Sequence, residues 1–283
     1  MIKHREKITK IIFTLSAGIS ILAVLLICFF LFLNGLPAIF KIGVFNFLLG
    51  KTWKPANNIF GLLPMIIGSF YVTGGAIILG VPIGILTAIF LAYFCPNKLY
   101  RYLKPAVELL AGIPSVVYGF FGLMVIVPLI RGLFTGNGNS LLAASIILGI
   151  MILPTIISIS EAAIRAVPRH YYEGALALGA SHERSVFFTV VPAAKSGILA
   201  GVILGVGRAI GETMAVIMVA GNQAIIPNSL FDGVRTLTAN IVLEMGYAAD
   251  LHREALIGTA VVLFVFILII NLSFSALKRK SNI

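Results

Sequence analysis

Long apolar stretches alternate with short polar segments along the whole chain. Six of the apolar stretches reach about 20 residues, the length that an α-helix needs to cross a hydrocarbon core of about 30 Å. They lie at 11–33, 65–94, 107–130, 141–160, 197–221 and 255–274. The pattern therefore predicts an all-α protein with six transmembrane helices.

The composition supports this prediction. Of the 283 residues, 59% are hydrophobic and only 11% are charged, and the mean hydropathy is +1.07. A soluble protein of this length cannot bury so much apolar surface. The class that fits is an integral membrane protein that crosses the bilayer several times.

The formal net charge of +11 is distributed unevenly between the two sides of the predicted spans. Six basic residues lie on the side opposite the N-terminus: Lys41, Lys51, Lys54, Arg131, Arg235 and Arg253. Arg208 lies within a span, and all other lysines and arginines lie on the side of the N-terminus. Because cytoplasmic loops are enriched in lysine and arginine, we expect both termini in the cytoplasm. Topology accounts for the positive charge, so nucleic acid is not an expected partner.

The fifth apolar stretch carries two opposite charges, Arg208 and Glu212, near its middle. An arginine at the centre of a spanning helix costs about 2.5–3.5 kcal/mol on insertion scales, so such a residue normally faces other helices or water. Residues four apart stack on one face of a helix. We therefore expect Arg208 and Glu212 to pair across one turn. The alternative is a neutralised pair that only locks two helices together.

Small residues recur every four positions along the same stretch. They are Gly197, Gly201, Gly205 and Ala209. On a helix they fall on the face that carries the two charges, and a ladder of small residues lets membrane helices approach closely. We therefore expect helix packing along this face, with the charged pair at the seam.

The helical pattern breaks before the third span. Pro114 cannot continue a helix but can begin one. Ser115 follows it, and the free N–H groups of a new helix there could attract an anion. The interpretation that we favour is a simple kink between an inner surface helix and the span.

The longest inner segment, 161–196, is too short for a catalytic domain and must act by docking. Within it, Glu173 to Ala180 form a candidate helix that ends at Gly179, and Ser181 can cap a second helix. Glu173 is placed where a carboxylate favours a helix N-terminus. The outer segment 222–254 holds a candidate amphipathic helix at 237–245, which could meet an extracytoplasmic partner.

Metal and disulfide chemistry are not indicated. None of the four histidines has a neighbour at the spacing of metal ligands, so we expect no metal site and a solvated surface for all four. They are His4, His170, His182 and His252. The two cysteines, Cys28 and Cys95, cannot form a disulfide framework.

Nucleotide chemistry is not indicated either. Gly50, Lys51 and Thr52 resemble the end of a phosphate-binding loop, but Phe45 stands where the first glycine belongs. We therefore expect no catalytic residue and no cofactor bound by this chain.

The inner segment resembles the EAA signature of bacterial ABC importer permeases. Glycine replaces the usual second alanine, and the spacing from Gly179 to Pro192 fits. In that family the loop forms helices that sit in a groove of the ATPase subunit. The resemblance implies that coupling to an ATPase is carried by Glu173, Gly174, Ala175, Leu176, Gly179 and Ala180.

Three longer segments resemble the PstC-type permease subunits of the bacterial phosphate importers. They are LLAGIPSVVYGFFGL at 109–123, ALALGAS at 175–181 and GRAIGETMAVIMVAGN at 207–222. The resemblance implies a type I ABC importer permease (MetI-like) fold in the bacterial cytoplasmic (inner) membrane. It also implies a second permease subunit of the PstA type, two ATPase subunits of the PstB type that bind ATP and Mg²⁺, and an extracytoplasmic phosphate-binding protein of the PstS type.

On this basis residues 1–63 form a basic tail, the first span and an outer loop, and residues 64–283 form the permease core, with 161–196 as its coupling loop. We expect a non-catalytic subunit that moves inorganic phosphate. Arg208 would offer donors to the ion, Glu212 would hold Arg208, and Thr213 and Ser115 would complete the path. The alternatives are a permease for molybdate, sulfate or an organic solute, the PstA-type paralogue, an ion-coupled secondary transporter or channel, and a structural assembly subunit.

Overall fold

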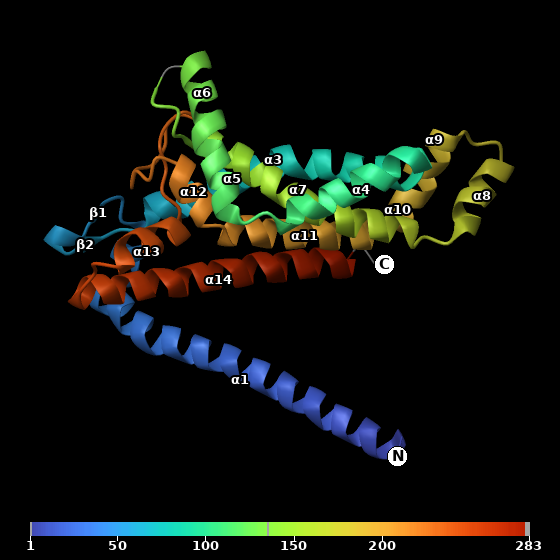
Figure 1. The fold of residues 1–283 in the computed structure, drawn as a ribbon. Coiled ribbons are helices and arrows are strands. Elements are labelled where there is room, and N and C mark those ends of the chain that lie inside the picture. The colour runs from blue at the N-terminus through green and yellow to red at the C-terminus, as the bar shows by residue number, and fades with distance from the viewer. Residues whose placement is uncertain (1, 135, 281–283) are drawn as a thin grey trace.

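The structure is a computed structural model that describes residues 2–134 and 136–280, with side chains described over 9–134 and 136–273. Within these residues the chain is almost entirely helical (Figure 1). The one sheet among them is a two-stranded antiparallel hairpin, in which Trp53 pairs with Phe60 and Lys54 with Ile59.

The elements follow one another in this order: α1 (Ile2–Ile42), α2 (Val44–Leu49), β1 (Trp53–Lys54), η1 (Pro55–Asn57), β2 (Ile59–Phe60), α3 (Leu63–Ile89), η2 (Phe90–Phe94), α4 (Asn97–Gly112), α5 (Ser115–Phe121), η3 (Gly122–Ile126), α6 (Val127–Leu133), α7 (Leu141–Arg165), α8 (Arg169–Ala177), α9 (His182–Ser185), η4 (Val186–Val190), α10 (Val191–Ala193), α11 (Lys195–Gly211), α12 (Met214–Val219), α13 (Leu237–Met245) and α14 (Asp250–Lys280).

Five helical segments of the described chain are long and apolar enough to cross a membrane, at Thr9–Ile42, Leu63–Phe94, Ser115–Leu133, Leu141–Arg165 and Asp250–Ser273. A bent pair, His182–Ala193 with Lys195–Gly211, makes a sixth if its 69° bend lies within one span. The predicted number of spans therefore agrees with the structure once the bent pair is counted.

The predicted bounds of two spans are wrong. The third predicted span, 107–130, begins inside α4, but α4 is a separate helix that ends at Gly112, and the span itself starts at Ser115. The fifth predicted span, 197–221, is divided between α11 and α12. Hydropathy alone cannot locate such breaks, because the residues on both sides of each break are apolar.

Helix α7 forms the centre of the bundle. Of the five single spans it has the largest buried share, 61% of its most apolar window, and α3 and α11 pack along it. Ile147, Ile152 and Ile156 of α7 are fully buried in the main core. From the last turn of α7 the chain passes directly into the segment that contains α8.

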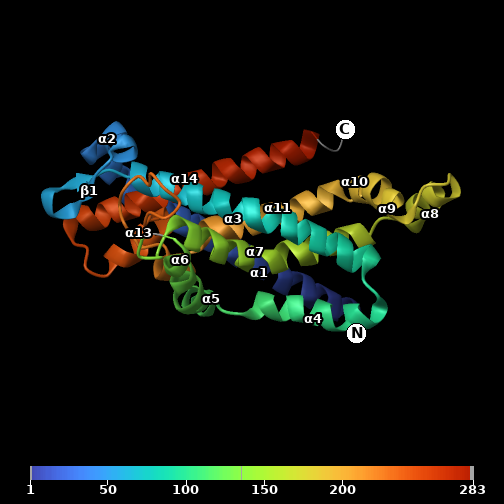
Figure 2. The ribbon, with the colours of Figure 1, turned by 90° about the horizontal axis from the view of Figure 1, so that it is seen from above.

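The two ends of the bundle differ. We call the end that carries α8 and α9 the inner end and the end that carries β1, β2 and α13 the outer end, after the predicted topology. The first residues of α1 and the last of α14 both lie toward the inner end (Figures 1 and 2). At the outer end α1 packs on α14, and a second core forms around Phe47, Trp53 and Phe60.

Candidate functional site

The fifth predicted span is interrupted at Glu212. Helix α11 ends at Gly211, and the backbone of Glu212 is extended (φ −69°, ψ 134°). Its Oε1 accepts hydrogen bonds from the backbone N–H groups of Thr213, at 3.1 Å, and Ala215, at 3.2 Å. The first N–H groups of a helix have no partner within the helix, so this carboxylate satisfies donors at the start of α12.

The predicted pairing of Arg208 with Glu212 is therefore wrong. Such a pair requires a continuous helix between the two residues, and α11 stops one residue before Glu212. Among the ion pairs of the described residues, none joins these two side chains. Instead, the Glu212 backbone carbonyl accepts a hydrogen bond from Oγ1 of Thr238 in α13, at 3.1 Å, which ties the break to the outer end.

Arg208 lies half-buried in the last turn of α11. Within the described part of the chain its side chain makes one long hydrogen bond, from Nη1 to Oγ1 of Thr155 in α7 at 3.5 Å. A helix C-terminus favours a positive charge, but no carboxylate of the described residues lies within ion-pair distance. A charge left without a counter-charge in a membrane-spanning segment marks a candidate anion contact or water-filled path.

The small residues of α11 pack against α7, which confirms the predicted close approach. A Cβ at Gly197 would collide with the Cβ of Ala163, and one at Gly201 would lie 3.1 Å from Ser160 Oγ. At Gly205 a Cβ would lie 2.9 Å from Ile156, and Ala209 is buried in the core. Larger side chains on this face would separate the two helices.

Ser115 begins α5 after a break at Ile113 and Pro114, as predicted. Its side chain is half-buried and makes no hydrogen bond with the described residues. The hydroxyl of Tyr118, one turn further along α5, donates a hydrogen bond to the backbone carbonyl of Leu110 in α4 at 2.8 Å. The two helices are thus joined across the corner as well as through the chain.

Helix α5 lies directly against α12. A Cβ at Gly119 would be 2.9 Å from Cα of Ala215, so the two backbones approach closely. The structure therefore brings the helix that starts at Ser115 beside the helix that starts after Glu212 and Thr213. These residues of the predicted path belong to two helices in contact.

The predicted coupling loop consists of two short helices joined by a glycine turn. Helix α8 ends at Ala177, Gly179 has a positive φ of 84°, and Ser181 Oγ accepts from the N–H of Arg184 to cap α9. Both the glycine stop and the serine cap agree with the prediction. Tyr172 in α8 and Nδ1 of His182 in α9 lie 2.8 Å apart and share a hydrogen bond, which fixes the angle between the helices.

The predicted coupling residues lie mostly on the outside of this loop. Glu173, Gly174, Leu176 and Gly179 are exposed, and Leu178 between them is 91% exposed. The prediction that Glu173 supports a helix N-terminus is wrong, because α8 begins four residues earlier at Arg169. An apolar side chain so exposed at the inner end is suited to contact another protein.

A buried carboxylate at the inner end was not predicted. Glu161, near the end of α7, is 2% exposed, and it accepts hydrogen bonds from Lys104 (2.7 Å), Tyr100 (2.8 Å) and Arg165 (2.7 Å). We call these four residues the Glu161 cluster. Arg165 also donates to the backbone carbonyl of Leu91, which lies within the π-helical segment η2, at 2.7 Å.

The pKa values within α4 reflect this cluster. Burial opposes the charge of Lys104, but the hydrogen bond and the negative charge of Glu161 outweigh it, and the pKa of Lys104 lies above its ordinary value. The hydrogen bond to Glu161 also raises the pKa of Tyr100. At neutral pH Lys104 is therefore charged and Tyr100 carries its proton, as the observed geometry requires.

A second buried carboxylate, Glu244 of α13, joins the elements of the outer end. It accepts hydrogen bonds from Arg235 (2.6 Å) and Trp53 Nε1 (2.8 Å), and its Oε2 lies 2.8 Å from Nε2 of His252. We call these four residues the Glu244 cluster.

The expectation that all four histidines are solvated is wrong for His252, which belongs to this cluster. His182 is half-buried and shares its hydrogen bond with Tyr172. His170 is exposed, and the side chain of His4 lies outside the described residues.

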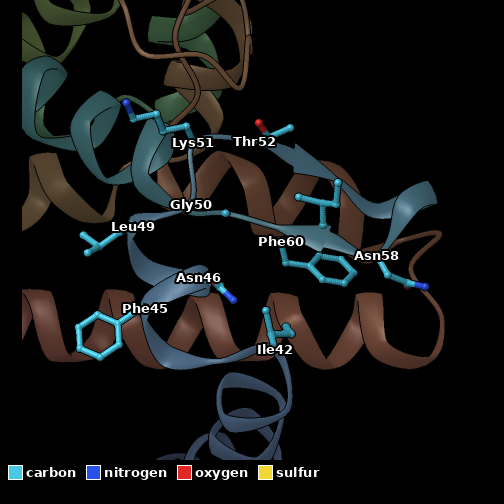
Figure 3. Close-up of a pocket in the computed structure, with 11 residues that line it drawn as sticks. Ile42, Phe45, Asn46, Leu49, Gly50, Lys51, Thr52, Asn58 and Phe60 are labelled. Atoms are coloured by element: carbon cyan, nitrogen blue, oxygen red, sulfur yellow. The ribbon is translucent and has the colours of Figure 1, made fainter.

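An open hollow of about 570 Å³ lies between α2 and the hairpin. Asn46 projects from α2 toward Ile42 and Phe60, whereas Phe45 and Leu49 point to the other side of α2 (Figure 3). Lys51 and Thr52 lie on its rim and lead into a strand rather than a helix. This confirms that they are not the end of a nucleotide-binding loop, which requires a helix after the glycine turn.

Membrane-spanning helices with a polar break in one span and an exposed loop at one end are features of a transport permease. A family model described as "Binding-protein-dependent transport system inner membrane component" matches residues 80–282. The chain belongs to this family, and it is a multi-pass membrane protein.

Relatives narrow the resemblance further. The chain is 41% identical over 280 residues to a "Probable ABC transporter permease protein YqgH" of Bacillus subtilis, covering 96% of this chain and 91% of the relative. It is 39% identical over 247 residues to a "Phosphate transport system permease protein PstC" of Mesorhizobium japonicum, covering 80% and 76%. A PstC of Haemophilus influenzae is 37% identical over 78% of this chain and 76% of the relative. These relatives confirm the predicted PstC-type resemblance.

Solved structures confirm the predicted fold. An inward-facing form of the MetNI methionine ABC transporter matches with a TM-score of 0.62 and 19% identity, over 81% of this chain and 99% of that chain. An amino acid ABC transporter solved with histidines matches with a TM-score of 0.56 and 21% identity, over 76% and 92%. At these identities the likeness shows the MetI-like permease fold.

Proposed function

We propose that this chain is the permease subunit through which an ATP-driven importer moves inorganic phosphate across the bacterial cytoplasmic membrane. The relatives named as phosphate permeases support the substrate. The observation that carries the proposal is Arg208, a half-buried guanidinium beside a broken span with no carboxylate of the described residues neutralising it.

The chemistry of Arg208 suits phosphate. A guanidinium offers several donors in one plane, which match the oxygens of a phosphate ion. At a separation of about 4 Å and an effective dielectric constant of about 20, the attraction is about 4 kcal/mol, which corresponds to roughly a thousandfold enrichment of the anion. Attraction of this size concentrates phosphate in the path without trapping it.

The other predicted path residues have revised roles. Glu212 does not hold Arg208; its carboxylate caps α12 and so fixes the position of the break. Thr213 lies at the break itself, and its hydroxyl donates to the Gly211 carbonyl at 3.2 Å. Ser115 opens the neighbouring helix and offers a hydroxyl to the path.

ATP hydrolysis belongs to other subunits in this proposal. Two ATPase subunits of the PstB type would bind ATP and Mg²⁺ and receive the exposed loop at Glu173–Ala180, and this chain is a non-catalytic subunit. A second permease of the PstA type would complete the path, and a phosphate-binding protein of the PstS type would dock at the outer end. No cofactor is assigned to this chain.

Three other functions are alternatives to this one. A permease for molybdate or sulfate would present the same guanidinium to a different oxyanion, and the PstA-type paralogue would place it in the other subunit. An ion-coupled secondary transporter would use Arg208 and Glu212 as a proton-linked pair, but the two side chains are not paired in this structure and the exposed loop would have no role.

The test is phosphate uptake by proteoliposomes that contain this chain with its second permease, ATPase and binding protein. We expect uptake to require ATP on the inner side, and Arg208→Gln to abolish it while the complex still assembles. Arg131→Gln is the matched control, because Arg131 lies exposed at the outer turn and bonds only the Asn137 carbonyl among the described residues.

Three outcomes would contradict the proposal in different ways. Normal uptake by Arg208→Gln would remove the guanidinium from the path. Molybdate or sulfate that competes as well as phosphate would change the substrate. Uptake driven by an ion gradient without ATP would replace the importer with a secondary transporter.

A further inference from the structure

A continuous series of contacts leads from the coupling loop to the break at Glu212. It starts at the inner end of α7, where Arg165 lies four residues before the start of α8. Arg165 and Glu161 are joined by a bond of 2.7 Å, and Glu161 in turn holds Lys104 and Tyr100 of α4. The first step therefore joins the segment that carries α8 to α4.

The Glu161 cluster forms a polar attachment between helix α4 and the bundle. None of its residues is buried, and α7 is the helix that it mainly contacts. It lies on the flank of the bundle opposite α14 (Figures 1 and 2). Because apolar packing on α4 is so limited, the polar contacts of Glu161 decide where this helix lies.

The second step joins α4 to α5. The connection between them is short, and the hydrogen bond from the Tyr118 hydroxyl to the Leu110 carbonyl spans the corner. Tyr118 itself is buried, with 6% of its surface exposed. A displacement of α4 is therefore transmitted to the start of α5, where Ser115 lies.

The third step joins α5 to the break. Gly119 lets the backbone of α5 touch α12 at Ala215, and the N–H of Ala215 is bonded to the Glu212 carboxylate at 3.2 Å. The series thus ends at the residues that interrupt the fifth span.

We propose that Glu161 is a positioning residue that makes α4 move together with the inner end of α7, so that a displacement of α8 reaches α5 and the break at Glu212. This inference rests on the proposed function, because it describes how ATP hydrolysis by a partner would open the phosphate path. Glu161 acts through α4 and does not contact phosphate.

The first test compares phosphate transported per ATP hydrolysed in proteoliposomes of the complete complex. In Glu161→Gln we expect assembly and ATP hydrolysis within about twofold of the unchanged protein, and a fall in transported phosphate per ATP of about tenfold or more, since loss of a buried counter-charge is a large perturbation. Glu108→Gln is the matched control: Glu108 lies on the same helix, is exposed and is 3.5 Å from Lys104. An unchanged ratio in Glu161→Gln would overturn the inference.

The second test asks whether the contacts act in series. Tyr118→Phe removes one hydroxyl and should reduce phosphate per ATP by about threefold. Because both residues lie on the same route, the double variant should behave like Glu161→Gln alone. A double variant whose loss is the product of the two single losses would show independent effects and overturn the route.

A third measurement does not depend on transport. In a chain with Cys28→Ser and Cys95→Ser, spin labels at Arg101→Cys and Ala162→Cys, both exposed positions, report the distance between α4 and α7. We expect one narrow distance, with and without nucleotide, and a broad distribution when Glu161→Gln is added. If the complex transports no phosphate at all, the proposed function fails, but the distance between α4 and α7 still tests Glu161. A distance distribution that stays narrow in Glu161→Gln would overturn the positioning role of Glu161.

Discussion

Three charged side chains, those of Glu161, Glu244 and Arg208, differ in what surrounds them. Glu161 and Glu244 are buried and surrounded by hydrogen-bond donors, so they stabilise the positions of the helices that supply those donors. Arg208 has no such surroundings. A charge that the fold does not neutralise is available to a ligand, which is why Arg208 is the stronger candidate for the path.

Replacing Glu244 by glutamine should destabilise the outer end. The change keeps the shape but leaves Arg235 without its counter-charge, and loss of one partner from a buried pair costs about 3 kcal/mol. The chain has a single tryptophan, Trp53, whose indole N–H is bonded to this carboxylate. Thermal unfolding of the purified chain, followed by tryptophan fluorescence, should therefore show a lower midpoint and a changed emission maximum.

The matched control for this prediction is Glu254→Gln. Glu254 is an exposed carboxylate of α14, so its loss should leave both the midpoint and the emission unchanged. Equal behaviour of the two variants would mean that the Glu244 cluster does not hold the outer end together.

At the scale of helices, breaks determine the architecture as much as apolar length does. The break between α4 and α5 follows from Pro114, which the sequence displays. The break between α11 and α12 depends on the Glu212 carboxylate, which satisfies N–H groups of the next helix. Glutamate four residues after an arginine equally favours a continuous helix with a salt bridge, so sequence reasoning could not choose between the two.

The packing of α11 on α7 predicts different effects on stability for two glycines of α11. Gly197→Ala should lower the free energy of unfolding of the purified chain by about 1–3 kcal/mol, because the new methyl group would collide with Ala163. Gly207→Ala should cause no loss, since a Cβ there has no atom within 4 Å and alanine favours a helix. Thermal unfolding in detergent measures both. Equal stability of the two variants would mean that the helices have room to adjust.

At the scale of the whole molecule, the predicted coupling loop is the part that we propose docks on a second protein. Gly179 adopts φ +84°, a conformation that costs a residue with a side chain about 1–2 kcal/mol. Gly179→Val should therefore disturb the angle between α8 and α9 and weaken ATPase binding by about tenfold, measured by co-purification of the ATPase.

Gly174→Ala is the comparison for Gly179→Val. Gly174 lies within helix α8 and has open space around it, so alanine should leave ATPase binding intact. Retained binding and retained coupling in Gly179→Val would show that the loop does not need this turn.

Much of the architecture could be predicted, because long apolar stretches, proline, glycine and serine caps act locally. The glycine stop and the serine cap within the loop at 161–196, and the helix at 237–245, were predicted for that reason. The full clusters around Glu161 and Glu244 could not be predicted, since Lys104 lies 57 residues from Glu161 and Trp53 lies 191 residues from Glu244 in the sequence. One local signal of the Glu161 cluster was present in the sequence: Glu161 and Arg165 are four residues apart at the end of a span, a spacing that favours an ion pair on a helix. The topology, the domain division and the roles of the site residues remain predictions.

The contact between the first and last helices has a consequence for how the protein is made. α1 packs on α14 near Gly35 and Val261, and the most apolar window of α1 is 0% buried within the chain. A ribosome that adds about 5–20 residues per second completes α14 roughly 12–49 seconds after Gly35 has been synthesised. During that interval α1 must reside in lipid by itself. No charged residue lies between Lys10 and Lys41, so α1 can be inserted first and remain in lipid until α14 has been made.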